Sequence, residues 1–179
     1  MAELILILGG ARSGKSSLAE RLAGARGRVT YLATATAGDA EMAERIARHR
    51  DERRPDWRTV ECPTDPAAAL TAWAAETDCF LLDCVTLWVS NLLCDEASDG
   101  EARVQRALDA LLSAYARAGT DLLLVSNEVG LGLVPEYPLG RLYRDVLGRA
   151  NQRLAAHADK VYGVIAGLPV EFKSLACDI

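Results

Sequence analysis

Lysine is scarce in this 179-residue chain: of its 20 basic residues, only those at positions 15, 160 and 173 are lysine. Acidic residues number 25, so the formal net charge is −5. General nucleic-acid-binding proteins usually carry a basic surplus, and the composition therefore argues against that class while leaving room for a local anion site. Because lysine is rare, a lysine inside a motif is also less easily explained by chance.

Cysteine pairs and long apolar runs are absent as well. The five cysteines form no C-x-x-C pair, so we expect no disulfide framework, no zinc site and a reducing, cytoplasmic location. No run approaches the roughly 18 apolar residues of a membrane span, so we expect no stable membrane insertion. The N-terminal run Leu4–Leu8 is too short for a secretory signal, and Glu3 stands where such signals carry positive charge.

Short apolar runs of strand length alternate with helical patterns along the chain. We expect strands over 4–8, 29–33, 58–61, 80–85, 122–125 and 161–166. Between them we expect helices over 16–25, 40–54, 66–76, 87–93, 102–118 and 142–154, and loops over 95–101 and 130–140. Continuous apolar strands separated by helices indicate parallel strands that are buried on both faces. The sequence therefore predicts a three-layer α/β fold with a mostly parallel sheet, formed by a single domain that spans 1–179.

The segment that follows the first predicted strand matches the pattern G-x-x-x-x-G-K-[ST]. It reads Gly9-Gly10-Ala11-Arg12-Ser13-Gly14-Lys15-Ser16. Glycines allow the backbone to bend until several N–H groups converge on phosphate oxygens. In such a loop Lys15 reaches the β and γ phosphates, and Ser16 offers its hydroxyl to Mg²⁺. The strand before the motif and the helix after it predict a P-loop NTPase-like nucleotide site in which Lys15 is a catalytic residue.

A phosphate loop of this kind also needs an acidic residue at the end of a neighbouring strand, where it holds Mg²⁺ or a water molecule of the ion. Asp83 is the favoured candidate because the apolar run of residues 80–82 leads directly into it. Glu128 follows the next apolar strand and is the alternative. Either carboxylate can also be a helix cap or a surface group at a strand end.

The segment 41–54 is densely charged and contains one of the two histidines of the chain, His49. Its i, i+4 pairs of glutamate and arginine are typical of a solvated helix face. Arginines on either side disfavour the cationic imidazole, however, which indicates a neutral, nucleophilic His49. Neighbouring guanidinium groups can hold a triphosphate while the imidazole attacks it. A half-buried structural histidine is the competing interpretation.

Together these residues resemble the bifunctional adenosylcobinamide kinase / adenosylcobinamide-phosphate guanylyltransferase family nearly end to end. The similar stretches lie within 9–16, 31–34, 41–49, 57–61, 82–86, 90–93, 127–130, 134–136 and 148–155. The first of them reads GGARSGKS and the last reads GRANQRLA. Phosphate loops are common, but this combination is specific.

The resemblance implies a P-loop enzyme of vitamin B12 assembly with two reactions. A kinase step moves the γ-phosphate of ATP or GTP to the hydroxyl of adenosylcobinamide, and a guanylyltransferase step moves GMP from GTP to the resulting phosphate. His49 takes the position of the histidine that carries GMP covalently in the family. Beyond residues 9–16, the implied nucleotide contacts are Thr34, Ala35, Thr36, Arg50, Asp51, Glu52, Arg53, Glu61 and Asp83, with Mg²⁺ at Ser16 and Asp83. The family often has glutamate at the position of Asp83, and aspartate shortens the reach of that carboxylate.

The resemblance also implies a homotrimer, in which Trp88 or Leu131 lies at an interface unless it belongs to the core.

Two other functions fit the phosphate loop. A different P-loop kinase for a small metabolite would use Lys15, Ser16 and Asp83 but not a covalent histidine. A non-enzymatic, nucleotide-gated binding protein would switch its predicted loops and transfer nothing to a corrinoid.

Overall fold

The centre of the molecule is a parallel sheet, seen in the part of the chain that the computed structural model describes: residues 2–38, 40, 44, 46–47, 50, 54–94 and 99–177. Within these residues seven strands follow the order β3-β2-β4-β5-β1-β6-β7. They are β1 (Leu4–Gly9), β2 (Val29–Ala33), β3 (Arg58–Glu61), β4 (Cys79–Asp83), β5 (Asp121–Asn127), β6 (Lys160–Ile165) and β7 (Leu168–Glu171). All neighbouring strands are parallel, except that β7 runs antiparallel to β6.

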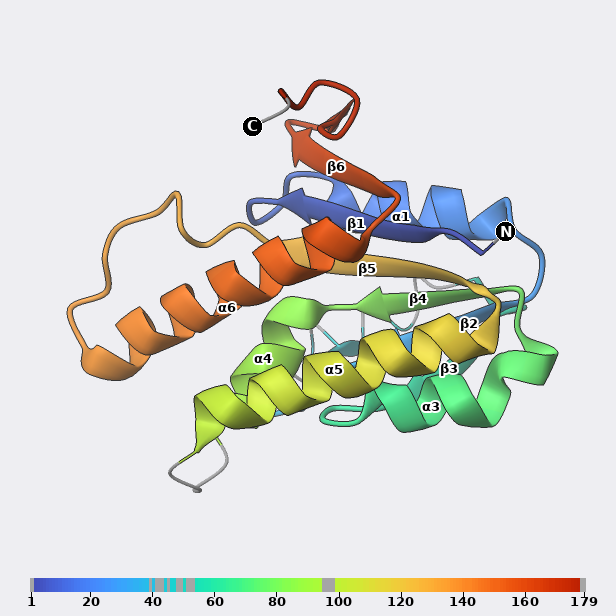
Figure 1. The fold of residues 1–179 in the computed structure, drawn as a ribbon, viewed down its shortest axis with the longest axis horizontal. Helices are drawn as coiled ribbons and strands as arrows, with labels where there is room; N and C mark the ends of the chain where they lie inside the picture. The colour runs from blue at the N-terminus through green and yellow to red at the C-terminus, as the bar shows by residue number, and fades with distance from the viewer. Residues whose placement is uncertain are drawn as a thin grey trace.

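Helices cover both faces of this sheet (Figure 1). On one face lies α1 (Lys15–Gly24), and on the other lie α3 (Pro66–Trp73), α4 (Val85–Cys94), α5 (Gly100–Ala118) and α6 (Pro138–His157). A 3₁₀ turn, η1 (Ala74–Glu76), extends α3. In the charged segment, the described positions 40, 44, 46, 47 and 50 are helical. The predicted three-layer α/β fold with a mostly parallel sheet is confirmed.

The central strands are buried on both faces because their apolar residues are continuous. In β1, Leu4 and Leu6 pack with α3 to α6, whereas Ile5 and Ile7 pack against α1. All four side chains are at most 1% exposed. Successive side chains of a strand point to opposite faces, so an unbroken apolar run contributes to both halves of the core.

The C-terminal hairpin was not predicted. The sequence pattern suggests one last strand over 161–166, but β6 ends at Ile165, and Ala166 and Gly167 form a turn with positive φ angles of 51° and 80°. The chain then returns as β7, which is short, largely exposed and interrupted by Pro169. An exposed edge strand with proline carries little apolar signal, which explains why the pattern missed it.

Several helix boundaries also differ from the predicted ones. Gly100 opens α5 and Pro138 opens α6, so parts of the two stretches predicted as loops are helical. The helix predicted over 66–76 ends at Trp73 and continues as η1. Most of the predicted helix 40–54 and its cap lie outside the described residues. No helix of the described chain is both long enough and apolar enough to cross a bilayer.

Candidate functional site

The carboxyl ends of five parallel strands bring predicted site residues to one edge of the sheet. Along this edge stand Glu61 of β3, Thr34 after β2, Asp83 of β4, Glu128 after β5, and the loop after β1. Adjacent strands lie about 4.8 Å apart, so the ends of β3 and β1 are about 19 Å from each other. The predicted residues therefore form an elongated row, in which Glu61 is far from the phosphate loop of the same chain.

The phosphate loop is tightly closed at its first and last glycines. Gly14 has a φ angle of 95° and stands directly before α1, a conformation that glycine adopts without steric cost. A Cβ at Gly9 would lie 2.4 Å from Ser13 Oγ and 2.7 Å from the carbonyl oxygen of Val164. A Cβ at Gly10 would meet no atom within 4 Å. The two neighbouring glycines of the motif therefore have different structural requirements.

The unpredicted hairpin supports this loop from the side. The backbone N–H of Gly167 donates to the carbonyl oxygen of Ser13 over 2.8 Å. A Cβ at Gly14 would lie only 3.2 Å from the Cα of Gly167, so glycine meets glycine at this contact. Gly167 is the only glycine of this turn and the signal that could have indicated it, because glycine adopts a positive φ angle without steric cost.

Lys15 and two serines are the polar side chains at the end of the loop. Lys15 Nζ donates to the carbonyl oxygen of Gly10 over 3.1 Å, which folds the ammonium group over the loop. Among the described residues, Ser13 Oγ is one of three buried side-chain oxygens without a hydrogen-bond partner. Ser16 is half-buried in the first turn of α1. Loop residues Ala11 and Arg12 are exposed.

Asp83 occupies the end of β4, with its side chain anchored from β2. Tyr31 Oη donates to Asp83 Oδ2 over 3.0 Å. The Asp83–Cys84 peptide bond is cis. Burial, followed by the charge of Asp83, raises the pKa of the Cys84 thiol to about 11, while the Lys15 ammonium slightly offsets this rise. The thiol is therefore neutral at physiological pH. Lys15 lies near enough to the end of β4 for its charge to influence the Cys84 thiol.

Glu128 lies closer to the phosphate loop than Asp83 does. Its backbone N–H donates to the carbonyl oxygen of Gly9 over 3.2 Å. Asp83 aligns with Val125 of β5, which in turn aligns with Ile7 of β1. The backbone of Asp83 is therefore one strand further from the loop, and it is level with a residue two positions before Gly9. Both acidic candidates thus belong to the same edge, and Asp83 faces it from β4.

Thr34 lies inside the fold and holds the end of β4. Its side chain is 0% exposed, and its hydroxyl donates to the Cys84 carbonyl oxygen and accepts from the Cys84 N–H, each over 2.8 Å. Ala35 is half-buried and Thr36 is exposed. Thr34 therefore shapes the site through Cys84, whereas Thr36 can present its side chain to a ligand.

Several positioning residues escaped the sequence analysis. Asn91 Nδ2 donates to the carbonyl oxygens of Thr34 (2.8 Å) and Pro63 (3.0 Å), which ties α4 to the loops after β2 and β3. Asn151 of α6 accepts from Ser126 Oγ over 2.7 Å and donates to the Asn127 carbonyl oxygen over 3.1 Å. Buried polar side chains on otherwise apolar helix faces are the signal that could have identified them.

Thr86 fixes the end of β5 in the same way. Its hydroxyl accepts from the Asn127 N–H over 2.8 Å, and its carbonyl oxygen accepts from Tyr143 Oη over 3.2 Å. Burial raises the pKa of Tyr143 well above its ordinary value, so this phenol stays a hydrogen-bond donor. The edge that carries the site is thus held by helices α4 and α6.

The charged segment reaches the same edge at one described point. Arg50 forms an ion pair with Glu61 at the end of β3. Further along, the Arg54 guanidinium lies 5.9 Å from the centre of the Trp57 ring. The predicted residues His49, Asp51, Glu52 and Arg53 lie outside the described residues. Arg50 and Glu61 are brought together, and they are separated from the phosphate loop by the three strands between β3 and β1.

Replacing Thr34 with valine is expected to destabilise the protein by about 2–3 kcal/mol, because two main-chain groups of Cys84 lose their partner. Thr34→Ser keeps the hydroxyl and serves as the matched control, with an expected loss of about 1 kcal/mol for the missing methyl. Chemical denaturation of the two variants measures the difference. Equal stabilities would show that the hydroxyl bridge contributes nothing.

A strand, a glycine-rich loop, a lysine over that loop and a helix beginning at its end define a nucleoside-triphosphate-binding α/β protein of the P-loop class. Residues 5–172 match the family described as cobinamide kinase / cobinamide phosphate guanyltransferase. The chain belongs to this family.

Curated relatives from three bacteria cover nearly the whole chain. The chain is 44% identical to the bifunctional adenosylcobalamin biosynthesis protein CobU of Salmonella typhimurium, over 95% of this chain and 99% of the relative. It is 49% identical to the bifunctional adenosylcobalamin biosynthesis protein CobP of Pseudomonas aeruginosa, over 94% of this chain and 96% of the relative. It is 42% identical to the protein CobU of Escherichia coli, over 95% of this chain and 99% of the relative.

Family membership confirms the resemblance that the motifs indicated. The chain is a bifunctional enzyme of adenosylcobalamin biosynthesis, a cobinamide kinase and cobinamide phosphate guanylyltransferase. The two alternatives, a P-loop kinase for another metabolite and a non-enzymatic nucleotide-gated protein, are therefore set aside.

Proposed function

We propose that the chain phosphorylates adenosylcobinamide with ATP or GTP at the phosphate loop, and then transfers GMP from GTP to adenosylcobinamide phosphate through a guanylyl-His49 intermediate. The observation that carries the kinase half is Lys15 Nζ, held 3.1 Å from the Gly10 carbonyl oxygen inside a closed phosphate loop. The product is adenosylcobinamide-GDP.

The kinase half depends on charge neutralisation by the loop. Backbone N–H groups of the loop and of the first turn of α1 bind the phosphates in this proposal, and Lys15 exchanges its contact with Gly10 for the β- and γ-phosphate oxygens. Ser13 Oγ, buried and without a partner among the described residues, gains a phosphate oxygen as acceptor. Charge that develops on the phosphates during transfer is thereby stabilised.

The oxygen atoms at this edge suit Mg²⁺. Mg²⁺ prefers hard oxygen ligands and usually keeps several waters, with one or two protein groups and the substrate phosphates completing its shell. Ser16 Oγ and the Asp83 carboxylate are ligands of that kind, and no cluster of three His, Cys, Asp or Glu is present in the described chain to hold a metal by protein groups alone. When bound, Mg²⁺ neutralises charge on the β and γ phosphates.

The guanylyltransferase half uses covalent catalysis. The His49 imidazole attacks the α-phosphorus of GTP, the bond to the bridging oxygen of pyrophosphate breaks, and pyrophosphate leaves. A phosphate oxygen of adenosylcobinamide phosphate then attacks the same phosphorus, the P–N bond breaks, and the imidazole is released. Two displacements of moderate difficulty replace one difficult displacement. The proposed nucleotide contacts that directly follow the histidine in sequence are Arg50, Asp51, Glu52 and Arg53.

The contact between Arg50 and Glu61 supports this placement. The residue next to His49 in the sequence reaches the end of β3, at the same edge of the sheet as the phosphate loop. Glu61 can accept hydrogen bonds from guanine or ribose when Arg50 turns to a phosphate. Both side chains are more than half exposed, so the ion pair itself contributes little to stability and can open.

A homotrimer in a reducing cytoplasm is the proposed setting. Trp88 is 1% exposed and belongs to the core, whereas Leu131 and Leu133 are 90% and 96% exposed. Exposed apolar side chains on one loop are typical of an interaction surface. All five cysteines are free thiols, which agrees with a reducing compartment.

Covalent labelling tests the proposal. Protein is incubated with Mg²⁺ and GTP labelled at the α-phosphate, denatured, and counted for bound label. We expect an acid-labile, alkali-stable label on the unmodified protein and none on His49→Ala, because such a label is typical of a P–N bond and the variant lacks the proposed nitrogen nucleophile.

The chain offers a matched control in its other histidine. His157 ends α6, where its Nδ1 lies 2.9 Å from the carbonyl oxygen of Arg153. His157→Ala is expected to keep the full label. A folded, GTP-binding protein that takes no label, or a His49→Ala variant that still does, would contradict the covalent mechanism.

A further inference from the structure

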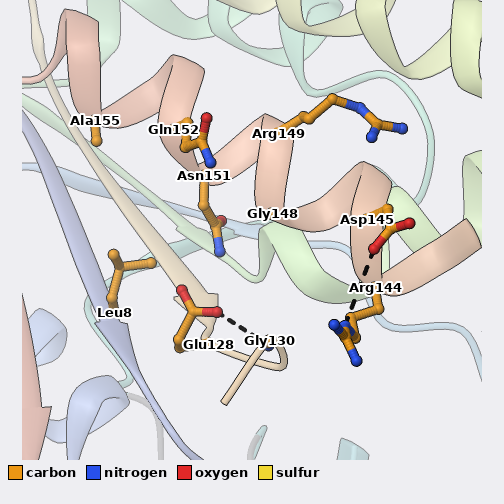
Figure 2. A pocket seen from close by; sticks show the side chains of 10 residues that line it. All are labelled: Leu8, Glu128, Gly130, Arg144, Asp145, Gly148, Arg149, Asn151, Gln152 and Ala155. Carbon is orange, nitrogen blue, oxygen red and sulfur yellow. Dashed lines mark hydrogen bonds and ion pairs between the residues drawn. The ribbon is translucent and has the colours of Figure 1, made fainter. Parts of the chain in front are cut away.

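A cleft of about 490 Å³ opens between the end of β5 and α6, beside the phosphate loop. Figure 2 shows Leu8, Glu128 and Gly130 along one wall and Gly148, Asn151 and Gln152 of α6 along the other. Leu8 directly precedes the loop, and the Glu128 N–H donates to the Gly9 carbonyl oxygen. The cleft therefore borders the place where the phosphates of a nucleotide bind.

Gly148 is a glycine that the fold does not require. It lies within α6, and a Cβ built on it meets no atom within 4 Å. Glycine inside a helix is destabilising relative to alanine, because it loses more conformational freedom on folding. A glycine in a cleft wall that neither backbone geometry nor packing demands indicates that the space in front of it is used by a ligand.

Glu128 is the carboxylate of this cleft without a described cationic partner. The other acidic lining residue, Asp145, lies 4.0 Å from Arg144, and the second arginine of the lining pairs with a carboxylate elsewhere. Gly130 N–H donates to Glu128 Oε1 over 3.0 Å and fixes the carboxylate. Figure 2 shows the Glu128 side chain directed across the cleft toward α6.

We propose that this cleft receives the hydroxyl-bearing arm of the corrinoid acceptor, and that Glu128 is the general base of the kinase step; the inference rests on the proposed function. The hydroxyl oxygen attacks the γ-phosphorus, the bond between that phosphorus and the β–γ bridging oxygen breaks, and the nucleoside diphosphate leaves. The hydroxyl proton passes to the Glu128 carboxylate. In guanylyl transfer the acceptor is an ionised phosphate, so that step needs no base.

Two variants test the two parts of this inference. Glu128→Gln keeps the shape of the side chain, and it is expected to lower kcat of the kinase step by about 10²–10⁴-fold. The same variant should transfer GMP to cobinamide phosphate at close to the rate of the unmodified enzyme. Gly148→Leu is expected to raise the KM for cobinamide by about tenfold or more while the KM for the nucleotide stays unchanged.

Ala156→Leu is the matched control for the second variant, because it places the same side chain at an exposed position of α6 outside the cleft lining. It should leave both steps unchanged. Equal slowing of the two steps by Glu128→Gln would make Glu128 structural, and an unchanged cobinamide KM in Gly148→Leu would place the acceptor elsewhere. These kinase comparisons do not use the guanylyl label, so a failure of labelling contradicts the covalent mechanism without deciding this inference.

Discussion

Replacing Lys15 with methionine is expected to lower kcat/KM of the kinase step by about 10³-fold or more. The ammonium group donates to the Gly10 carbonyl oxygen of the loop, where we propose that the β and γ phosphates bind. Methionine retains the length of the side chain and removes the charge. The measurement is cobinamide phosphorylation at saturating and subsaturating nucleotide, with folding checked by thermal denaturation.

The scarcity of lysine supplies a clean control. Lys160 lies at the start of β6, at the opposite edge of the sheet, and pairs with Glu3. Lys160→Met removes the same charge from the chain but is expected to leave kinase activity intact, with a stability change on the order of 1 kcal/mol for a partly exposed ion pair. Kinase activity in Lys15→Met within about tenfold of normal would refute the proposed role of Lys15 in transition-state stabilisation.

Gly9→Ala is expected to cost about 1–3 kcal/mol of folding stability and to weaken nucleotide binding. The added Cβ would lie 2.7 Å from the Val164 carbonyl oxygen and 2.4 Å from Ser13 Oγ, so either the backbone of β6 or the loop must shift. For a chain of this size the loss corresponds to a fall in Tm of about 2–12 °C. Calorimetry without nucleotide measures it directly.

Gly10→Ala is the paired control at the next position of the motif. Its Cβ would meet no atom within 4 Å, and its φ angle is not among the positive ones. We expect a stability change within about 0.5 kcal/mol, as for surface substitutions without special features. If Gly10→Ala were as destabilising as Gly9→Ala, the loss would not come from the contact with β6, because a Cβ at Gly10 makes no such contact.

The parallel strands were predictable because their signal is local. The apolar runs at 4–8, 29–33 and 122–125 became β1, β2 and β5 with shifts of at most two residues at either end. A strand that is buried on both faces must be apolar throughout, so periodicity and length identify it. By contrast, β7 is exposed and interrupted by proline, and its pairing with β6 follows from a turn that the pattern did not weigh.

The candidate site was predictable in kind and less so in arrangement. The strand before the motif around Lys15 and the helix after it lie where the sequence predicted them, since the motif and its flanking elements are consecutive in sequence. Thr34 also fell at the right edge, but its hydroxyl turned out to be buried against Cys84. Asn91, Thr86 and Asn151 escaped because each acts on backbone groups of a distant segment.

The sequence by itself determined the class of the protein: the layers of the fold, the phosphate loop with Lys15, and the family whose motifs run along the chain. Only the tertiary structure decided which strands are neighbours. The order β3-β2-β4-β5-β1 separates Glu61 from the phosphate loop by about 19 Å and sets Glu128 against Gly9. Strand order depends on how helices and strands distant in sequence pack together, and a local pattern carries no information on those contacts.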